Sequence, residues 1–121
     1  MSKTKTVLIF DDDTIILEVI TVVLIDLGLN VEVSETSHDI IPRVESSKPD
    51  LILMDNWIPN IGGVEATRLL KADARFNHIP VIYVSANNDI QSLADRAGAD
   101  DFLSKPFDLE DLENIVNKYI T

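Results

Sequence analysis

The stretch VLIFDDD, residues 7–13, runs from four apolar residues straight into three carboxylates. Three other short runs also end on a polar residue: 51–54 before Asp55, 81–84 before Ser85 and 102–104 before Lys105. Short apolar runs that alternate with helical segments are typical of buried parallel strands joined by crossover helices. Ligands bind in the crevice outside the carboxyl ends of such strands. The sequence therefore predicts an α/β fold that brings these polar residues to one site.

The composition is that of one globular domain, residues 1–121, with 45% hydrophobic residues. Its 21 acidic and 10 basic residues give a net charge of −11, which argues against nucleic acid as a partner. The chain has no cysteine, which excludes disulfides and thiolate metal sites. We find no apolar segment long enough for a signal peptide or a membrane span, so we expect a cytoplasmic protein without a membrane partner.

Capping signals predict where the first helices begin and end. The first helix is expected to begin at Thr14, a suitable N-cap, and to stop at Gly28. The second is expected to begin near Asp39, because Pro42 then falls in the first turn, where no hydrogen-bond donor is missed. The strand between them, residues 30–34, alternates apolar and polar residues, which favours an edge position.

Three more helices are expected. The third follows Gly62-Gly63 and ends near Ala72, the fourth runs roughly from Asp89 to Ala97 and is closed by Gly98, and the last begins after Asp108, which can cap it. Apolar stripes predict which faces of the first and last helices are buried. The stripe residues are Ile16, Val19, Ile20, Val23 and Leu27 in the first helix, and Leu109, Leu112, Ile115, Val116 and Tyr119 in the last.

The predicted site is rich in carboxylates. Asp11, Asp12 and Asp55 would converge, and three like charges cannot all stay ionised together without a cation. A set of ligands that offers only oxygen suits Mg²⁺ or Mn²⁺. Carboxylates directly after a strand are more often helix caps than ligands, but Asp55 on a separate strand end reverses that preference. Lys105 offers a point charge, and Ser85 a hydroxyl, for the oxygens of a phosphoryl group.

The order and spacing of these motifs resemble the receiver domain of two-component response regulators, of the stand-alone chemotaxis-regulator type. The resemblance runs from Val7 to Tyr119. It implies a flavodoxin-like (βα)5 fold with a doubly wound, five-stranded parallel sheet in the order 2-1-3-4-5; these regulators are a standard example of that order, which is taken over from the family. The motifs are the acidic cluster after the first strand, Asp55 with Ile58-Pro59-Asn60 and Gly63, Ser85-Ala86, Ala97-Gly98-Ala99, and Lys105-Pro106-Phe107.

The resemblance implies a phosphoaccepting signalling domain rather than an enzyme, with self-catalysed phosphotransfer and autodephosphorylation. Asp55 would take a phosphoryl group from a histidine kinase or a histidine phosphotransfer protein. Asp12, Asp55 and the backbone carbonyl of Trp57 would bind Mg²⁺ (or Mn²⁺) directly, and Asp11 would act through a bound water. Lys105 would pair with the phosphoryl group, and the peptide bond that follows it, before a proline, would be cis.

The resemblance also implies a switch. Ser85 and Phe102 stand at the family's two switch positions, and they would pass the signal to a downstream protein target through the fourth helix, fifth strand and fifth helix. Phe102 replaces the commoner tyrosine and cannot donate a hydroxyl hydrogen bond.

A second apolar line on the first helix consists of Ile15, Val22 and Ile25, at spacings of seven and three. Two interpretations stay open. The line is either buried more deeply than expected, or it is an exposed strip that docks a partner. In the resembled family the first helix meets the histidine-bearing helices of the donor, which fits the docking interpretation.

Two other functions fit parts of the sequence. A haloacid-dehalogenase-like phosphatase would use Asp11 in an Asp-x-Asp motif, but those enzymes want Thr or Val where Ile15 stands and usually carry a cap domain. A flavin-binding flavodoxin-like module would need a Ser/Thr/Gly-rich phosphate loop where this chain has three carboxylates that repel phosphate.

Overall fold

The predicted fold class is confirmed by the computed structural model, which describes residues 4–58 and 61–120. One parallel sheet has the strand order β2-β1-β3-β4-β5. The strands are β1 (Thr6–Phe10), β2 (Asn30–Ser34), β3 (Leu51–Asp55), β4 (Val81–Ser85) and β5 (Asp101–Ser104). The helices are α1 (Thr14–Asp26), α2 (Ile40–Ser47), α3 (Gly62–Ala72), α4 (Ile90–Ala97) and α5 (Leu109–Ile120). Each helix in these ranges is too short or too polar to cross a bilayer.

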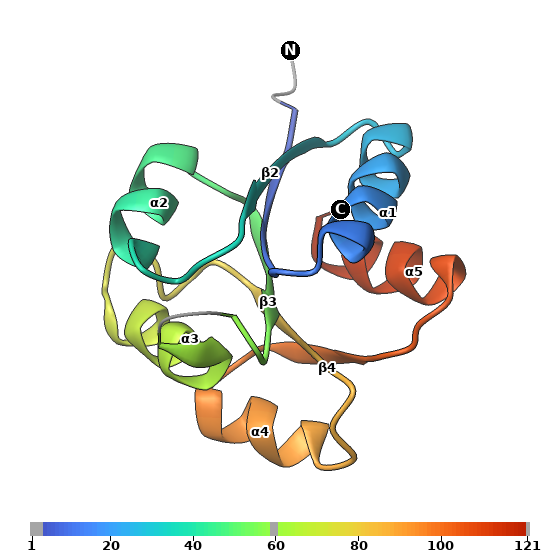
Figure 1. The fold of residues 1–121 in the computed structure, drawn as a ribbon. Helices are drawn as coiled ribbons and strands as arrows, with labels where there is room; N and C mark the ends of the chain where they lie inside the picture. The colour runs from blue at the N-terminus through green and yellow to red at the C-terminus, as the bar shows by residue number, and fades with distance from the viewer. Residues whose placement is uncertain (1–3, 59–60, 121) are drawn as a thin grey trace.

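Helices cover both faces of the sheet. Figure 1 shows α1 and α5 on one side and α2, α3 and α4 on the other. The inner strands β3 and β4 are buried along their whole length, which is why their sequences are apolar without alternation. The predicted edge position of β2 is confirmed, and its residues are exposed or half-buried.

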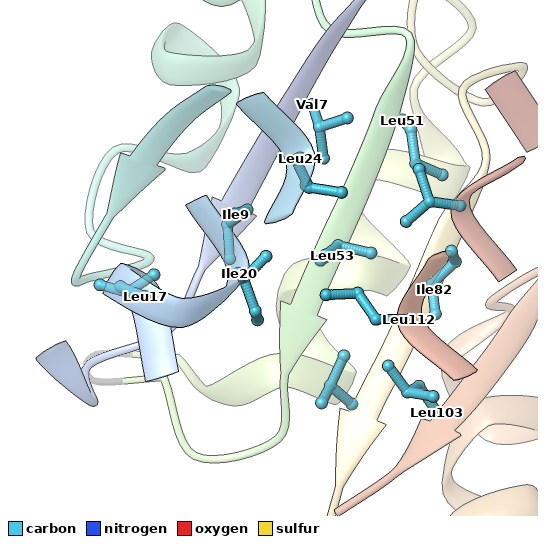
Figure 2. Packing of buried hydrophobic residues seen from close by; sticks show 12 residues of the cluster. Val7, Ile9, Leu17, Ile20, Leu24, Leu51, Leu53, Ile82, Leu103 and Leu112 are labelled. Atoms are coloured by element: carbon cyan, nitrogen blue, oxygen red, sulfur yellow. The ribbon is translucent and has the colours of Figure 1, made fainter. Parts of the chain in front are cut away.

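The side chains of each strand divide between two cores, because successive residues of a strand point to opposite faces. The core under α1 and α5 includes Val7 and Ile9 of β1 together with Leu53 of β3 (Figure 2). The alternate residues of the same strands, such as Leu8 and Met54, belong to the core under α2 and α3. Each large apolar side chain buried in this way stabilises the fold by about 1.5–3 kcal/mol.

The helix ends follow the sequence signals, with corrections to α1 and α3. The N-cap of α1 is Asp13, not Thr14: its carboxylate accepts hydrogen bonds from the N–H groups of Ile15 and Ile16. A carboxylate accepts two such bonds at once and also favours the positive end of the helix dipole. The helix itself ends at Asp26, two residues before Gly28.

The start of α3 also differs, because the helix includes Gly62 and Gly63 instead of following them. The predicted signals at the ends of the other helices are confirmed. Asp39 is the N-cap of α2, which places Pro42 in the first turn. Gly98 ends α4 with a φ of +80°, and the side chain of Asp108 accepts from the N–H of Asp111 at 2.8 Å.

The predicted buried stripe of α1 is partly wrong. Val19 and Leu27 are exposed, whereas Leu17, Ile20 and Leu24 are the residues that the core buries. The helix is apolar nearly all round, so its sequence does not single out one face. In α5, where polar residues define the stripe, Leu112 and Val116 are buried as predicted, although Leu109 in the first turn is exposed.

Candidate functional site

Strand alternation brings three charged residues to the same edge and the same face of the sheet. Asp11 lies two residues after Ile9, Asp55 two after Leu53 and Lys105 two after Leu103, and all three of these apolar residues belong to the core under α1 and α5. Strands β1 and β3 pair in parallel up to Phe10 and Met54, so Asp11 and Asp55 follow side by side.

The ammonium group of Lys105 lies between two buried carboxylates. Its Nζ is 2.7 Å from Oδ1 of Asp55 and 3.2 Å from Oδ2 of Asp11. Burial raises the pKa of Asp11 and the charge of Asp55 adds to this, against the opposing effect of the Asp13 N–H and of Lys105. Burial works to lower the pKa of Lys105, but its hydrogen bonds to Asp55 and Asp11 and their charges outweigh it and raise that pKa. Lys105 is therefore cationic in this site.

The carboxylates fit a divalent cation that prefers oxygen. One oxygen each from Asp11, Asp12 and Asp55 lie within 4.8 Å of one another. The carboxylate of Asp13, the third acid in the row, is engaged as the cap of α1. The cap interpretation thus holds for Asp13, and the ligand interpretation stays a prediction for Asp11 and Asp12. Oxygen ligands of this kind are those that Mg²⁺ and Mn²⁺ take in proteins.

Trp57, two residues after Asp55 in the chain, contacts the carboxylate of Asp55. Its backbone N–H donates to Oδ2 of Asp55 at 2.9 Å, while the residue as a whole is 79% exposed. Each oxygen of Asp55 therefore has a donor: Lys105 holds Oδ1 and the Trp57 backbone holds Oδ2. Pro59 and Asn60, which belong to the family motif after Asp55, lie outside the described residues.

Close packing of Gly63 fixes the backbone at the carboxyl end of β3, where Asp55 lies. A Cβ atom added to Gly63 would lie 2.3 Å from the backbone oxygen of Asp55 and 3.0 Å from Cα of Asn56. The N–H of Gly63 donates to the backbone oxygen of Asn56 at 3.1 Å. The absence of a side chain at this position is therefore what lets α3 begin directly against the site.

The two predicted switch residues lie on the opposite face of the sheet from Lys105. Ser85 is buried at the end of β4, where its Oγ accepts from the N–H of Asn87 at 3.0 Å and its carbonyl accepts from the N–H of Lys105 at 2.9 Å. Phe102 is half-buried and packs on the core under α4, which includes Tyr83. The backbone of Ser85 thus lies beside Lys105 at the edge of the sheet, and Phe102 lies on the α4 side.

The second apolar line of α1 is exposed. Ile15, Val22 and Ile25 are 72%, 68% and 58% exposed, so the interpretation that they are more deeply buried is wrong. Ile15 also borders an apolar groove of about 440 Å³ that reaches the site at Lys105 and is lined further by Ile16, Val19, Ala86, Pro106 and Phe107. The peptide bond between Lys105 and Pro106 is cis, as predicted.

Sequence reasoning missed one contact at this site. The hydroxyl of Tyr83 donates to Oδ1 of Asn56, the residue that follows Asp55. The only signal in the sequence is a tyrosine within an apolar strand, because a buried phenol usually finds a hydrogen-bond partner. Which partner it finds depends on the register of β3 against β4, where Tyr83 lies beside Met54.

Comparisons with known proteins agree with this geometry. The model of a family described as the response regulator receiver domain matches residues 7–117. The phosphate regulon transcriptional regulatory protein PhoB of Pseudomonas aeruginosa is 38% identical over 112 residues, which make up 89% of this chain and 48% of PhoB. The chain thus spans about half the length of that relative.

Two solved structures have the same fold over almost the whole chain. The receiver domain of the sensor histidine kinase PA1611 from Pseudomonas aeruginosa, with a magnesium ion coordinated in its active site cleft, has a TM-score of 0.87 and 29% identity, and 98% of each chain is covered. The signal receiver domain of a signal transduction histidine kinase from Syntrophus aciditrophicus has a TM-score of 0.88 and 25% identity, covering 97% of this chain and 90% of that one.

Proposed function

Because the chain belongs to the response regulator receiver domain family, we propose that residues 1–121 form one phosphoaccepting domain of a two-component system. Asp55 would take a phosphoryl group from a histidine kinase or a histidine phosphotransfer protein. The observation that carries this proposal is the ion pair of Lys105 with two buried carboxylates, Asp55 and Asp11, at the carboxyl edge of the sheet. A lysine between buried acids supplies the cation that an incoming phosphoryl group needs.

The transfer itself asks little covalent chemistry of the protein. An oxygen of Asp55 attacks the phosphorus of a phosphohistidine in line, a P–O bond forms, and the P–N bond breaks with its electron pair passing to the imidazole nitrogen, which then takes a proton. Lys105 and the Trp57 N–H already hold one oxygen of Asp55 each. They orient the carboxylate, and Lys105 offsets part of the charge that would repel an anionic donor.

Divalent metal binding is part of the proposal. Asp12, Asp55 and the backbone carbonyl of Trp57 would hold Mg²⁺ or Mn²⁺, and Asp11 would act through a water. When bound, the ion neutralises negative charge on the carboxylates and on the phosphoryl oxygens. The oxygen-only cluster of Asp11, Asp12 and Asp55 supports this, as does the magnesium ion in the similar PA1611 domain.

The response would pass through the α4-β5-α5 surface. An acyl phosphate on Asp55 adds charge and acceptor oxygens, one of which the hydroxyl of Ser85 would bind. Movement of Ser85 leaves space that Phe102 fills, which shifts an existing equilibrium between two conformations. Support comes from the burial of Ser85 at the site and from the packing of Phe102 on the core under α4.

The exposed residues of α1 are the proposed contact with the donor. Ile15, Val22 and Ile25 would pack on the histidine-bearing helices, and the groove beside Lys105 would receive apolar side chains next to the histidine. A downstream protein would bind the α4-β5-α5 surface. A cytoplasmic location stays a prediction from the sequence.

Labelling with acetyl phosphate tests the proposed function. In the presence of Mg²⁺ we expect one phosphoryl group per chain, on Asp55, and no label in Asp55→Asn. A matched control is Asp50→Asn, the same change just before the other end of β3, which should label like the parent protein. A label that persists in Asp55→Asn contradicts the assignment, and a label found on Asp11 would support the phosphatase alternative.

A further inference from the structure

Tyr83 is a buried tyrosine whose hydroxyl reaches the acceptor site from the α4 side of the sheet. The side chain is fully buried, and its ring forms a core with Ile90, Ala94 and Ala97 of α4. Burial, with a smaller effect of the charge of Asp55, raises its pKa to about 12. The phenol therefore keeps its proton and acts as a donor.

Asn56, which accepts the hydrogen bond from Tyr83, is held from three directions. Its Oδ1 accepts from the Tyr83 hydroxyl. Its backbone N–H donates to the carbonyl of Val84 at 3.0 Å, and its backbone oxygen accepts from the N–H of Gly63 at 3.1 Å. Asn56 thus joins β4, the start of α3 and the end of β3, and Tyr83 supplies the bond to its side chain.

Asn56 is the one residue between Asp55 and Trp57, whose N–H donates to Oδ2 of Asp55 at 2.9 Å. A rotation of Asn56 moves that N–H, because consecutive residues share rigid peptide planes. The direction of the acceptor carboxylate is thereby connected through Asn56 to a hydroxyl under α4.

We propose that Tyr83 is a positioning residue for the phosphoacceptor: its hydroxyl holds the side chain of Asn56 and so keeps the Trp57 N–H on Asp55. The inference rests on the proposed function for its kinetic consequence, but the hydrogen bonds that it concerns exist without phosphorylation. Since the ring of Tyr83 lies under α4, the packing of that helix and the orientation of Asp55 depend on each other.

The test compares two substitutions that each remove one hydroxyl. Tyr83→Phe keeps the ring and removes the donor to Asn56. Tyr119→Phe removes the hydroxyl of the chain's other tyrosine. Tyr119 lies on α5, and its hydroxyl donates to the carboxylate of Asp101 at 2.9 Å. In metal-free protein, the amide hydrogen of Trp57, followed by NMR, should exchange about tenfold faster in Tyr83→Phe, a change equivalent to roughly 1.4 kcal/mol. In Tyr119→Phe it should exchange at the parent rate.

A double-mutant cycle on labelling by acetyl phosphate gives the second measurement. Tyr83→Phe and Asn56→Ala should each slow labelling about tenfold, and the double variant should be no slower than either single variant. A role of Tyr83 in packing alone would make the two losses multiply. Asn56→Ala keeps both backbone hydrogen bonds of residue 56, and it carries the amide-exchange test if Tyr83→Phe does not fold.

The outcomes separate this inference from the proposed function. Trp57 exchange that is unchanged in the folded Tyr83→Phe protein, or in Asn56→Ala, overturns the inference, as does a double variant with multiplied losses. A parent protein that takes no label overturns the proposed function instead, and the Trp57 amide alone then decides whether Tyr83 positions Asp55.

Discussion

Gly63→Ala should impair phosphorylation far more than it impairs folding. The added Cβ would lie 2.3 Å from the backbone oxygen of Asp55, whereas ordinary contacts of a Cβ begin at 3.4 Å. The neighbouring atoms are backbone, which cannot rotate away like a side chain, so the end of β3 has to move by roughly 1 Å, a displacement of a reacting group that can cost about 100-fold in rate. Overpacking of this kind destabilises a fold by about 1–3 kcal/mol.

Gly62→Ala is the matched control. An added Cβ on Gly62 meets nothing within 4 Å, but the residue has a φ of +78°. An alanine there is strained by about 1–2 kcal/mol without pressing on Asp55. The two variants should therefore lose similar stability through different causes.

The assay is the initial rate of labelling by acetyl phosphate with saturating Mg²⁺, beside urea unfolding of both variants. Gly63→Ala should label about 100-fold more slowly than the parent protein, and Gly62→Ala within a factor of about three, as expected for an unmoved site. Equal labelling rates for the two variants would refute the reasoning from the close approach of Gly63.

Val22→Asp should slow transfer from a phosphohistidine protein about tenfold, equivalent to roughly 1.4 kcal/mol, and leave acetyl phosphate labelling unchanged; Leu69→Asp, on α3, should affect neither. Equal loss with both donors would mean that Val22 only supports the fold. Trp57→Ala should speed autodephosphorylation about tenfold, because the indole shields the acyl phosphate from water; an unchanged or longer half-life after donor removal would contradict this. Asp11→Asn should raise the free energy of unfolding in metal-free buffer at pH 7. The pKa of Asp11 is raised, mainly by burial and further by the charge of Asp55. The contribution of Asp11 to stability is therefore fully present below its unfolded pKa of 3.8 and is lost as the pH rises through its folded pKa. The gain should therefore shrink as urea titrations move toward pH 4, and a gain independent of pH would refute it.

Local signals in the sequence predict much of this fold. Pro42 loses no intrahelical hydrogen bond only if it lies in the first turn of a helix, and the structure has it there. The strands are buried apolar runs whose ends carry polar residues, so the convergence of Asp11, Asp55 and Lys105 follows once the sheet is parallel.

Other features depend on contacts between elements and stay hidden in the sequence. The buried face of α1 is fixed by Leu17, Ile20 and Leu24, but the helix offers apolar residues on its other faces too. Similarly, the bond from Tyr83 to Asn56 exists because two strands pair in one register rather than another. Thr14 is a suitable N-cap by residue type, but the carboxylate of Asp13, one residue earlier, is the cap in the structure.

The pleat of the strands has a consequence for how such a domain diverges. Asp55 and Lys105 follow Leu53 and Leu103 of the core under α1 and α5, whereas Phe102 of β5 packs on the core under α4. Adjacent positions of a strand cannot exchange faces without a shift in register. Under the proposed function, substitutions at exposed positions of α1 could therefore change which donor is recognised while the packing under α4 is inherited intact. A lineage could acquire a new input for an old output by altering one face of one helix.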